Sequence, residues 1–126
     1  MLIKIDFESS EAIYLQLRNQ VIMGIATSAY REGDSLPSVR QLAQILGVNM
    51  HTVNKAYAVL KQEGFITLDK RNGAVIALNY DRYKTLEELK AQLQIVLARG
   101  RCKNITRDEF HELVDMIFDE YEGSRI

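Results

Sequence analysis

The sequence predicts an α+β fold in which three helices and a β-hairpin are followed by two further helices. Apolar residues recur at helical spacing over 11–28 and twice more before Gly64, the period then shortens to β-type runs over 65–78, and two amphipathic stretches with capping motifs follow. The chain has 126 residues, of which 47% are hydrophobic, and a net charge of −1, so it is long and apolar enough to form a core. We expect one domain over 1–78 and an appended segment over 79–126.

The first helix is predicted over residues 11–28. Its apolar positions lie four residues apart and form one stripe: Ile13, Leu17, Val21 and Ile25. Ser9 or Ser10 is expected to cap its start. A loop over 31–37, which contains Gly33 and the chain's single proline, then breaks the pattern.

A helix-turn-helix is predicted over the next residues. Ser38 followed by Gln41 has the form of a capping box, in which each side chain satisfies a backbone N–H near the helix start. Gly47 suits the left-handed end of this helix, and Asn49 is expected to cap the next one, which ends near Gly64. Two short helices joined by a tight turn that contains glycine are typical of this motif.

Two β-type runs over 65–68 and 74–78 follow, and Asn72-Gly73 between them favours a hairpin turn. Three helices followed by a hairpin are the element order of a winged helix-turn-helix. The fold class that the sequence predicts is therefore a winged helix-turn-helix with a two-helix C-terminal segment.

In that C-terminal segment, Thr85 with Glu88 and Thr106 with Glu109 each fit a capping box, which predicts two helix starts. The apolar faces of these helices carry Leu86, Leu89, Leu93, Val96, Leu97, Phe110, Leu113, Val114, Ile117, Phe118 and Tyr121. Two amphipathic helices cannot bury both faces in a hairpin of their own, so a partner chain is expected to cover them.

Several classes of function are excluded by what the sequence lacks. One cysteine, Cys102, excludes an intrachain disulfide framework, and His111 has no His or Cys at ligand spacing, so no metal or other cofactor is expected. Phosphate-binding loops and nucleophile elbows are absent, so we expect no enzyme. No apolar run reaches the ~18 residues of a membrane span, and the N-terminus turns acidic too early for a signal peptide. A cytoplasmic location is expected, and a redox role for Cys102, which is expected in a loop between Arg101 and Lys103, is a minor alternative.

Positive charge is concentrated in the elements that would meet DNA. From Arg40 to Gly73 there are five Lys or Arg residues and two acidic ones. Each phosphate contact should matter because the cations are few, and DNA binding should weaken steeply with salt. A chance distribution of charge on a solvated surface explains the pattern equally well, so charge alone does not decide.

The N-terminal domain resembles a known family in residues that run in register. These are Ile13-Tyr14-Leu15-Gln16, Gly33-Asp34-Ser35-Leu36-Pro37-Ser38-Val39-Arg40-Gln41-Leu42-Ala43, Leu46-Gly47-Val48-Asn49, Thr52-Val53, Ala56-Tyr57, Leu60 and Glu63-Gly64. Over about residues 12–78 the chain is similar to GntR-type transcriptional regulators, and its short remainder is similar to their YtrA-like subfamily. The resemblance implies a cytoplasmic bacterial repressor that binds double-stranded DNA with two-fold symmetry as a homodimer, joined through the apolar faces given above.

The chain departs from the family pattern at two places. Asn49-Met50 stands where the family commonly has Ser-Arg or Asn-Pro, and Arg71-Asn72-Gly73-Ala74 replaces a wing that usually reads Gly-Lys-Gly-Thr. Met50 therefore cannot make the guanine contact of an arginine, and the wing tip is expected to adopt a different turn.

The third helix of such a fold enters the major groove, and the second helix and the wing contact the backbone or the minor groove. The candidate DNA-binding residues are accordingly Ser38, Arg40, Asn49, Met50, His51, Thr52, Asn54, Lys55, Lys70, Arg71 and Gly73. For several of them a plainer role stays open.

Arg40 is expected to contact a phosphate or a base, although an arginine paired with a surface carboxylate would look the same. Met50 offers only apolar contact, for instance to a thymine methyl, whereas His51 and Thr52 can hydrogen-bond to bases or phosphates. Asn54 can form two hydrogen bonds to an adenine, but an exposed asparagine on a helix usually makes no such contact. Asn49 is either a phosphate contact or only a helix cap, and Lys55 is either a phosphate contact or part of a solvated helix face. Lys70 and Arg71 either contact DNA or belong to a solvated hairpin tip. Core packing is expected for Tyr14 and Tyr57.

Two hypotheses about function follow. The favoured one is a homodimeric DNA-binding regulator. The sequence is also compatible with an unidentified small-molecule effector that binds at the junction of the two copies. The alternative is a winged-helix module for protein–protein assembly without a DNA function, which the near-neutral charge supports. An assembly module has no need for the polar, basic face formed by Arg40, Thr52 and Lys55.

Overall fold

The computed structural model describes residues 3–123. These residues belong to two compact units, an N-terminal unit that ends at Asn79 and a C-terminal unit that begins at Tyr80.

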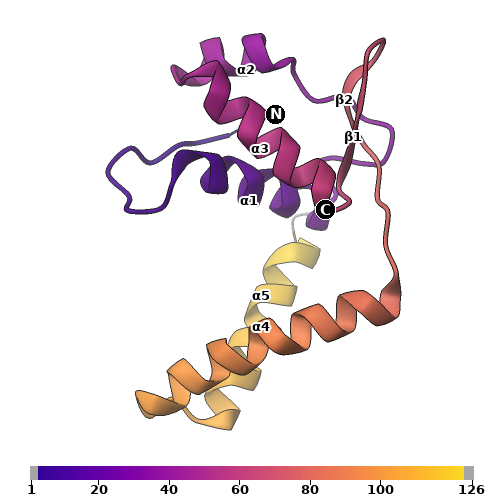
Figure 1. The fold of residues 1–126 in the computed structure, drawn as a ribbon. Helices are drawn as coiled ribbons and strands as arrows, with labels where there is room; N and C mark the ends of the chain where they lie inside the picture. The colour runs from indigo at the N-terminus through magenta and orange to yellow at the C-terminus, as the bar shows by residue number, and fades with distance from the viewer. Residues whose placement is uncertain (1–2, 124–126) are drawn as a thin grey trace. The chain divides into compact units, whose positions relative to one another are not determined.

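The N-terminal unit is a winged helix-turn-helix. Its elements follow in the order α1 (Ile13–Ala26), α2 (Val39–Leu46), α3 (Met50–Gln62), β1 (Ile66–Asp69) and β2 (Gly73–Ile76). The central element is α3, which contacts α1, α2 and β1 (Figure 1). The predicted succession of three helices and a hairpin is confirmed.

The core of this unit forms around α3. The buried hydrophobic residues are Leu17, Val21, Leu36, Leu42, Ala43, Val53, Ala56, Tyr57, Leu60, Ile66, Ala74 and Ile76. They come from every helix of the unit and from both strands. Burial of these side chains fixes how α1 and α2 lie against α3.

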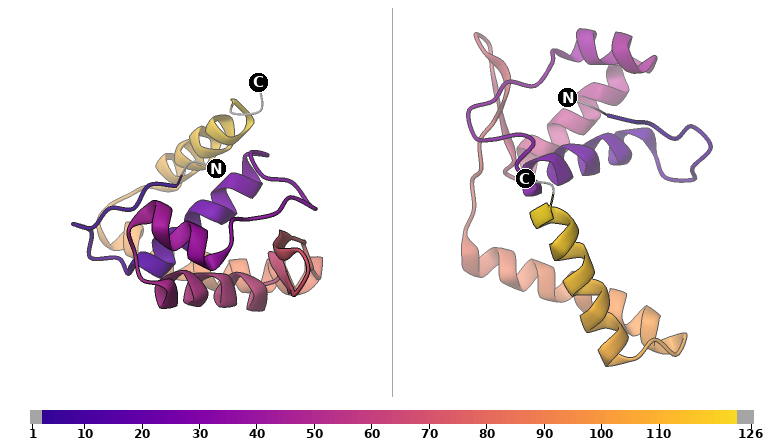
Figure 2. Two further views of the ribbon diagram at one scale, coloured as in Figure 1. Left: turned by 90° about the horizontal axis from the view of Figure 1, so that it is seen from above. Right: turned by 180° about the vertical axis from the view of Figure 1, so that it is seen from behind.

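Hydrogen bonds from two glutamine side chains hold the N-terminal segment against α1, which was not predicted from the sequence. The Gln20 amide accepts a hydrogen bond from the Lys4 N–H at 2.8 Å and donates to the Lys4 carbonyl. The Gln16 amide pairs in the same way with the backbone of Asp6, at 2.9 and 3.0 Å. Figure 2 shows this segment turning back to run beside α1. The predicted cap by Ser9 or Ser10 is wrong, because α1 follows Ala12 without a side-chain cap.

The caps predicted for α2 and α3 are confirmed. The Ser38 hydroxyl accepts from the Gln41 N–H and the Gln41 amide accepts from the Ser38 N–H, both at 3.1 Å. Gly47 ends α2 with φ +68°, a left-handed conformation that glycine adopts without strain. Asn49 caps α3 through a 2.8 Å hydrogen bond from the His51 N–H.

The hairpin differs from its prediction in its bounds and in its neighbour. β1 and β2 pair antiparallel from Ile66↔Ile76 to Asp69↔Gly73, so each strand lies about a residue from its predicted place. The predicted loop over 31–37 also pairs with β2, because the Leu36 N–H donates to the Ala74 carbonyl at 2.8 Å. This pairing anchors the wing to the segment that leads into α2.

The C-terminal unit consists of α4 (Arg82–Cys102) and α5 (Arg107–Gly123). The predicted capping role of Thr85 is wrong: Asp81 caps α4 by accepting from the Lys84 N–H at 3.2 Å, and Thr85 lies inside the first turn. Cys102 was expected in a loop but lies in the last turn of α4.

The turn between the two helices is well defined. Thr106 and Glu109 form the predicted capping box, with hydrogen bonds of 3.0 and 3.1 Å. The Phe110 ring lies against Gly100, where a Cβ atom would collide with it. From this turn α4 and α5 diverge (Figure 2), and neither helix has a buried residue.

Candidate nucleic-acid interface

Five of the eleven residues predicted to bind DNA lie on α3. Because α3 turns its apolar stripe into the core, the opposite positions meet solvent: His51, Asn54, Lys55, Ala58 and Lys61. Met50 and Thr52 complete the first turn, in which Met50 is 43% exposed and Thr52 is half-buried. We call Met50, His51, Thr52, Asn54 and Lys55 the recognition face.

The cap of α3 limits what Asn49 can do. Its Oδ1 is occupied by the His51 N–H, so the Nδ2 group of this exposed side chain is the end that remains for a phosphate. Capping and phosphate contact are therefore compatible at this residue.

The start of α2 is joined to α3 by a hydrogen bond. Arg40 is exposed in its first turn, and within residues 3–123 it makes no ion pair. The exposed Ser38 hydroxyl accepts the Gln41 N–H and can still donate. The Tyr57 hydroxyl donates to the Pro37 carbonyl at 2.7 Å, which ties α3 to the residue before the cap of α2. Burial raises the pKa of Tyr57 far above its usual range, so this hydroxyl stays a donor.

The wing tip holds its arginine by the backbone and leaves its side chain exposed. Asp69 accepts hydrogen bonds from the Arg71 N–H at 2.8 Å and from the Asn72 amide at 3.2 Å. Gly73 follows the turn with φ +70°, a left-handed conformation that glycine adopts without strain. Lys70, Arg71 and Gly73 are all exposed. The wing therefore presents two cations at its tip.

The electrostatic character of the face follows from the residue types along it. From Ser38 to Gln62 the chain has three cations, Arg40, Lys55 and Lys61, and no Asp or Glu. A surface of this kind attracts a polyanion although the whole chain is close to neutral.

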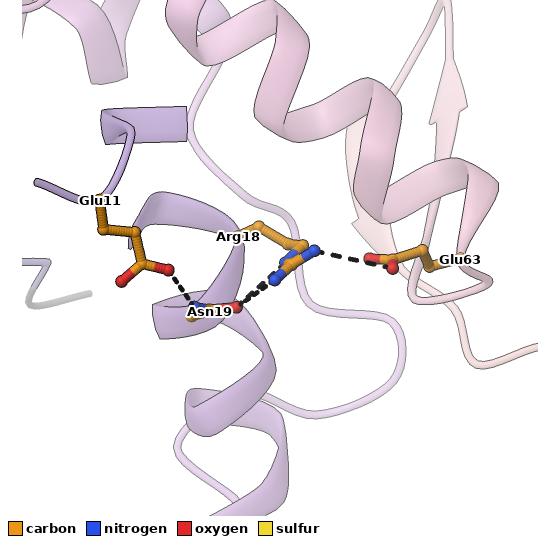
Figure 3. Close-up of polar contacts among 4 residues, drawn as sticks. All are labelled: Glu11, Arg18, Asn19 and Glu63. Carbon is orange, nitrogen blue, oxygen red and sulfur yellow. Dashed lines mark hydrogen bonds and ion pairs between the residues drawn. The ribbon is translucent and has the colours of Figure 1, made fainter. Parts of the chain in front are cut away.

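An ion pair beyond the end of α3 involves a basic residue of α1. A guanidinium nitrogen of Arg18 lies 3.8 Å from a carboxylate oxygen of Glu63 (Figure 3). The guanidinium also donates two hydrogen bonds to the Asn19 Oδ1 atom, at 2.8 and 3.0 Å, and the Asn19 amide group donates to the Glu11 carboxylate. This network joins α1 to the residue after α3. We therefore assign Arg18 to the scaffold and not to the interface.

Core packing was expected for Tyr14 and is confirmed, and its ring also contacts a residue of the recognition face. Tyr14 is half-buried and packs against the core, but the Nζ atom of Lys55 lies 4.1 Å from the centroid of its ring. Tyr57, the other tyrosine expected in the core, is 2% exposed.

The residues predicted to join two copies are exposed or half-buried in the C-terminal unit. Leu86, Leu93 and Phe118 are 54%, 50% and 58% exposed. Phe110 and Tyr121 are half-buried, and the remaining ones are exposed: Leu89, Val96, Leu97, Leu113, Val114 and Ile117. A soluble monomer rarely exposes apolar side chains in such number along one element pair.

Within residues 3–123, no three His, Cys, Asp or Glu side chains are grouped as metal ligands would be. In the same part of the chain, no helix combines the length and apolarity needed to cross a membrane.

Comparisons with known proteins agree with the fold and identify the family. Residues 10–76 match the family described as bacterial regulatory proteins, gntR family. The chain is 33% identical to the HTH-type transcriptional repressor YtrA of Bacillus subtilis (strain 168), over 98% of both chains.

Two solved structures are similar over nearly the whole chain. A protein described as a transcriptional antiterminator from Listeria monocytogenes EGD-e has a TM-score of 0.86 at 27% identity, over 96% of this chain and 92% of that one. YtrA from Sulfolobus acidocaldarius, a GntR-family transcription factor, has a TM-score of 0.57 at 41% identity, over 94% of this chain and 97% of that one.

The family model covers α1 to β2, which are the elements that build the recognition face and the wing. The relatives are named as regulators of transcription, so this chain is a transcription regulator and not an enzyme. With its matching fold and its similarity to YtrA along the full length, the chain belongs to the GntR family of bacterial regulatory proteins.

Proposed function

We propose that the protein is a sequence-specific repressor that binds an inverted-repeat operator as a homodimer. The observation that carries the proposal is the exposed recognition face of α3, which lies in a stretch from Ser38 to Gln62 without an acidic residue. In helix-turn-helix proteins this part of the third helix enters the major groove.

The residues divide into two groups by the contacts they can make. Arg40, Lys55, Lys70 and Arg71 are exposed cations that suit phosphates, and they would set the position of the chain on the duplex. His51, Thr52 and Asn54 can hydrogen-bond to base edges, and Met50 can contact a thymine methyl. The wing cations suit the backbone or a narrow minor groove.

The homodimer is supported by the C-terminal unit. Its apolar faces are exposed in the single chain, and a second copy covers them with the same residues. The charges of the two helices are also complementary, because α4 has five Lys or Arg and two Glu residues, whereas α5 has seven acidic residues and one arginine. Contact of α4 with α5 of a second copy therefore brings opposite charges together.

The relatives support repression and a cytoplasmic location. The similar protein from Bacillus subtilis is named a repressor, and a regulator of transcription acts where the chromosome lies, in the bacterial cytoplasm. Regulation by a small molecule bound between two copies stays a prediction from the sequence.

The decisive experiment is selection of bound sequences from a random pool of DNA, followed by titration of the selected site and a scrambled site over a series of salt concentrations. The proposal predicts enrichment of an inverted repeat and a steep fall of affinity with salt. Equal affinity for both sites would contradict it and favour an assembly module.

Two substitutions separate positioning from base recognition. Arg40→Ala should weaken binding to matched and scrambled sites alike and lower the salt slope by about 1, whereas His51→Ala should change the preferred base at particular positions. Lys84→Ala, which removes one exposed cation from α4, is the control and should leave the slope unchanged.

A further inference from the structure

A tyrosine of α1 lies beneath a cation of the recognition face. The Lys55 Nζ atom is 4.1 Å from the ring centroid of Tyr14, well within the distance at which an aromatic ring attracts a cation. Tyr14 lies in the first turn of α1, so the contact joins two elements that are far apart in the sequence.

The surroundings of the two residues show what the contact does. Tyr14 packs against the core, which keeps its ring from moving freely. Lys55 is exposed, and within residues 3–123 it makes no ion pair. The ring is therefore the group that localises an ammonium at the end of an otherwise flexible side chain.

We propose that Tyr14 is a positioning residue for DNA binding, whose ring holds the Lys55 ammonium ready for a phosphate of the DNA backbone. The proposal rests on the proposed function and adds a role for a residue outside the helix-turn-helix. The ring occupies one side of the ammonium, and the N–H groups on its other sides remain available as donors. A cation that is already ordered loses less conformational entropy when it binds, so the phosphate contact is stronger.

A double-mutant cycle tests the proposal. Tyr14→Leu keeps an apolar side chain against the core and removes the ring, and Lys55→Met keeps a long side chain and removes the charge. Affinity for the selected operator is measured for the full-length chain, both single variants and the double variant at one salt concentration. Tyr14→Phe, which keeps the ring and loses only the hydroxyl, is the matched control.

The proposal predicts that Tyr14→Leu weakens binding about 2- to 5-fold, the range for an exposed cation–π contact, and that Tyr14→Phe restores the affinity. In the Lys55→Met background, Tyr14→Leu should have no further effect, because its role passes through the ammonium. A general loss of folding would instead weaken binding by the same factor in both backgrounds.

Three results would overturn the proposal: equal losses in the two backgrounds, a loss with Tyr14→Phe that shows the hydroxyl to be the active group, or tighter binding by Tyr14→Leu. The nuclear magnetic resonance signals of the Lys55 side chain give a readout that does not need DNA. The ring should shift them upfield in the unchanged chain and in Tyr14→Phe, and not in Tyr14→Leu; identical shifts in all three chains would also overturn it.

The test distinguishes this inference from the proposed function. If the unchanged chain does not prefer the selected operator over scrambled DNA, the proposed function fails. If it does prefer the operator and the cycle is additive, only the role of Tyr14 fails.

Discussion

The two units of the chain handle their apolar residues in opposite ways. In the N-terminal unit Leu17, Val21, Val53 and Leu60 are completely buried, and α3 is surrounded by α1, α2 and the hairpin. In the C-terminal unit two longer helices bury no residue at all. Helix length and apolar patterning are therefore not enough for a core. The number of elements that can surround a helix decides whether its apolar face is covered within one chain.

The difference also divides the proposed function between the two units. The N-terminal unit is complete by itself and supplies the recognition face and the wing. The C-terminal unit, in our proposal, is completed by a second copy and determines how far apart two recognition faces are held.

The largest effect is expected for a leucine in the core of the N-terminal unit. Leu60 is completely buried, so Leu60→Ala should lower the free energy of unfolding by about 2–5 kcal/mol. Leu86→Ala makes the same change at a residue that is 54% exposed in the single chain. Urea unfolding at several protein concentrations measures both variants.

The cost of Leu86→Ala should depend on protein concentration, because its burial requires a second copy. The cost of Leu60→Ala should not. If both variants lost the same free energy at every concentration, the contrast between the units would be wrong.

The second prediction concerns the apolar face of α4. Leu93→Asp places a charge in that face and should weaken dimerisation by about 2 kcal/mol, or about 30-fold in Kd. Ala91→Asp introduces the same charge on the opposite side of the helix and is the control. Analytical ultracentrifugation measures the association of both variants. A dimer of unchanged affinity in Leu93→Asp would move the contact elsewhere on the chain.

The third prediction concerns the turn between α4 and α5. A Cβ atom at Gly100 would overlap the Phe110 ring, so Gly100→Ala should destabilise the C-terminal unit by about 1–2 kcal/mol. Phe110→Leu removes the ring and should compensate in the double variant. Thermal unfolding followed by circular dichroism measures the effect. Equal stability of Gly100→Ala and the unchanged chain would show that the two helices are not held at this point.

The smallest effect is expected for the capping box of α5. Hydrogen bonds from Thr106 lower the pKa of the exposed Glu109 carboxyl. A carboxyl whose pKa is lower in the folded state stabilises that state above its unfolded pKa, and the contribution disappears as the pH falls through the folded pKa. Glu109→Gln should therefore be less stable than the unchanged chain near neutral pH, and the difference should vanish in acid. Melting temperatures over a pH series test this, and a pH-independent difference would contradict it.

Local chemistry decided which parts of the fold could be predicted. The starts of α2, α3 and α5 were predicted because Ser38, Asn49 and Thr106 cap them with side chains a few residues from their partners. The start of α4 was missed although Asp81 is a good cap, because Thr85 and Glu88 offered a competing motif farther along the chain.

Features that depend on distant partners could not be predicted. One example is the pairing of residue 35 with Val75, and another is the set of hydrogen bonds by which Gln16 and Gln20 hold the N-terminal segment against α1. Both join segments that come close only in the folded chain. The same is true of the site. Its residues on α2, α3 and the wing could be named from the motif order, whereas the contact of Tyr14 with Lys55 requires the packing of α1 against α3.

The most direct test of the account is the mass of the complex that the chain forms with the full inverted repeat and with a half-site, measured together with the two affinities. The account predicts two chains on the full repeat, much weaker binding to the half-site, and loss of this difference in Leu93→Asp. A single chain that binds the full repeat and the half-site equally well would contradict it.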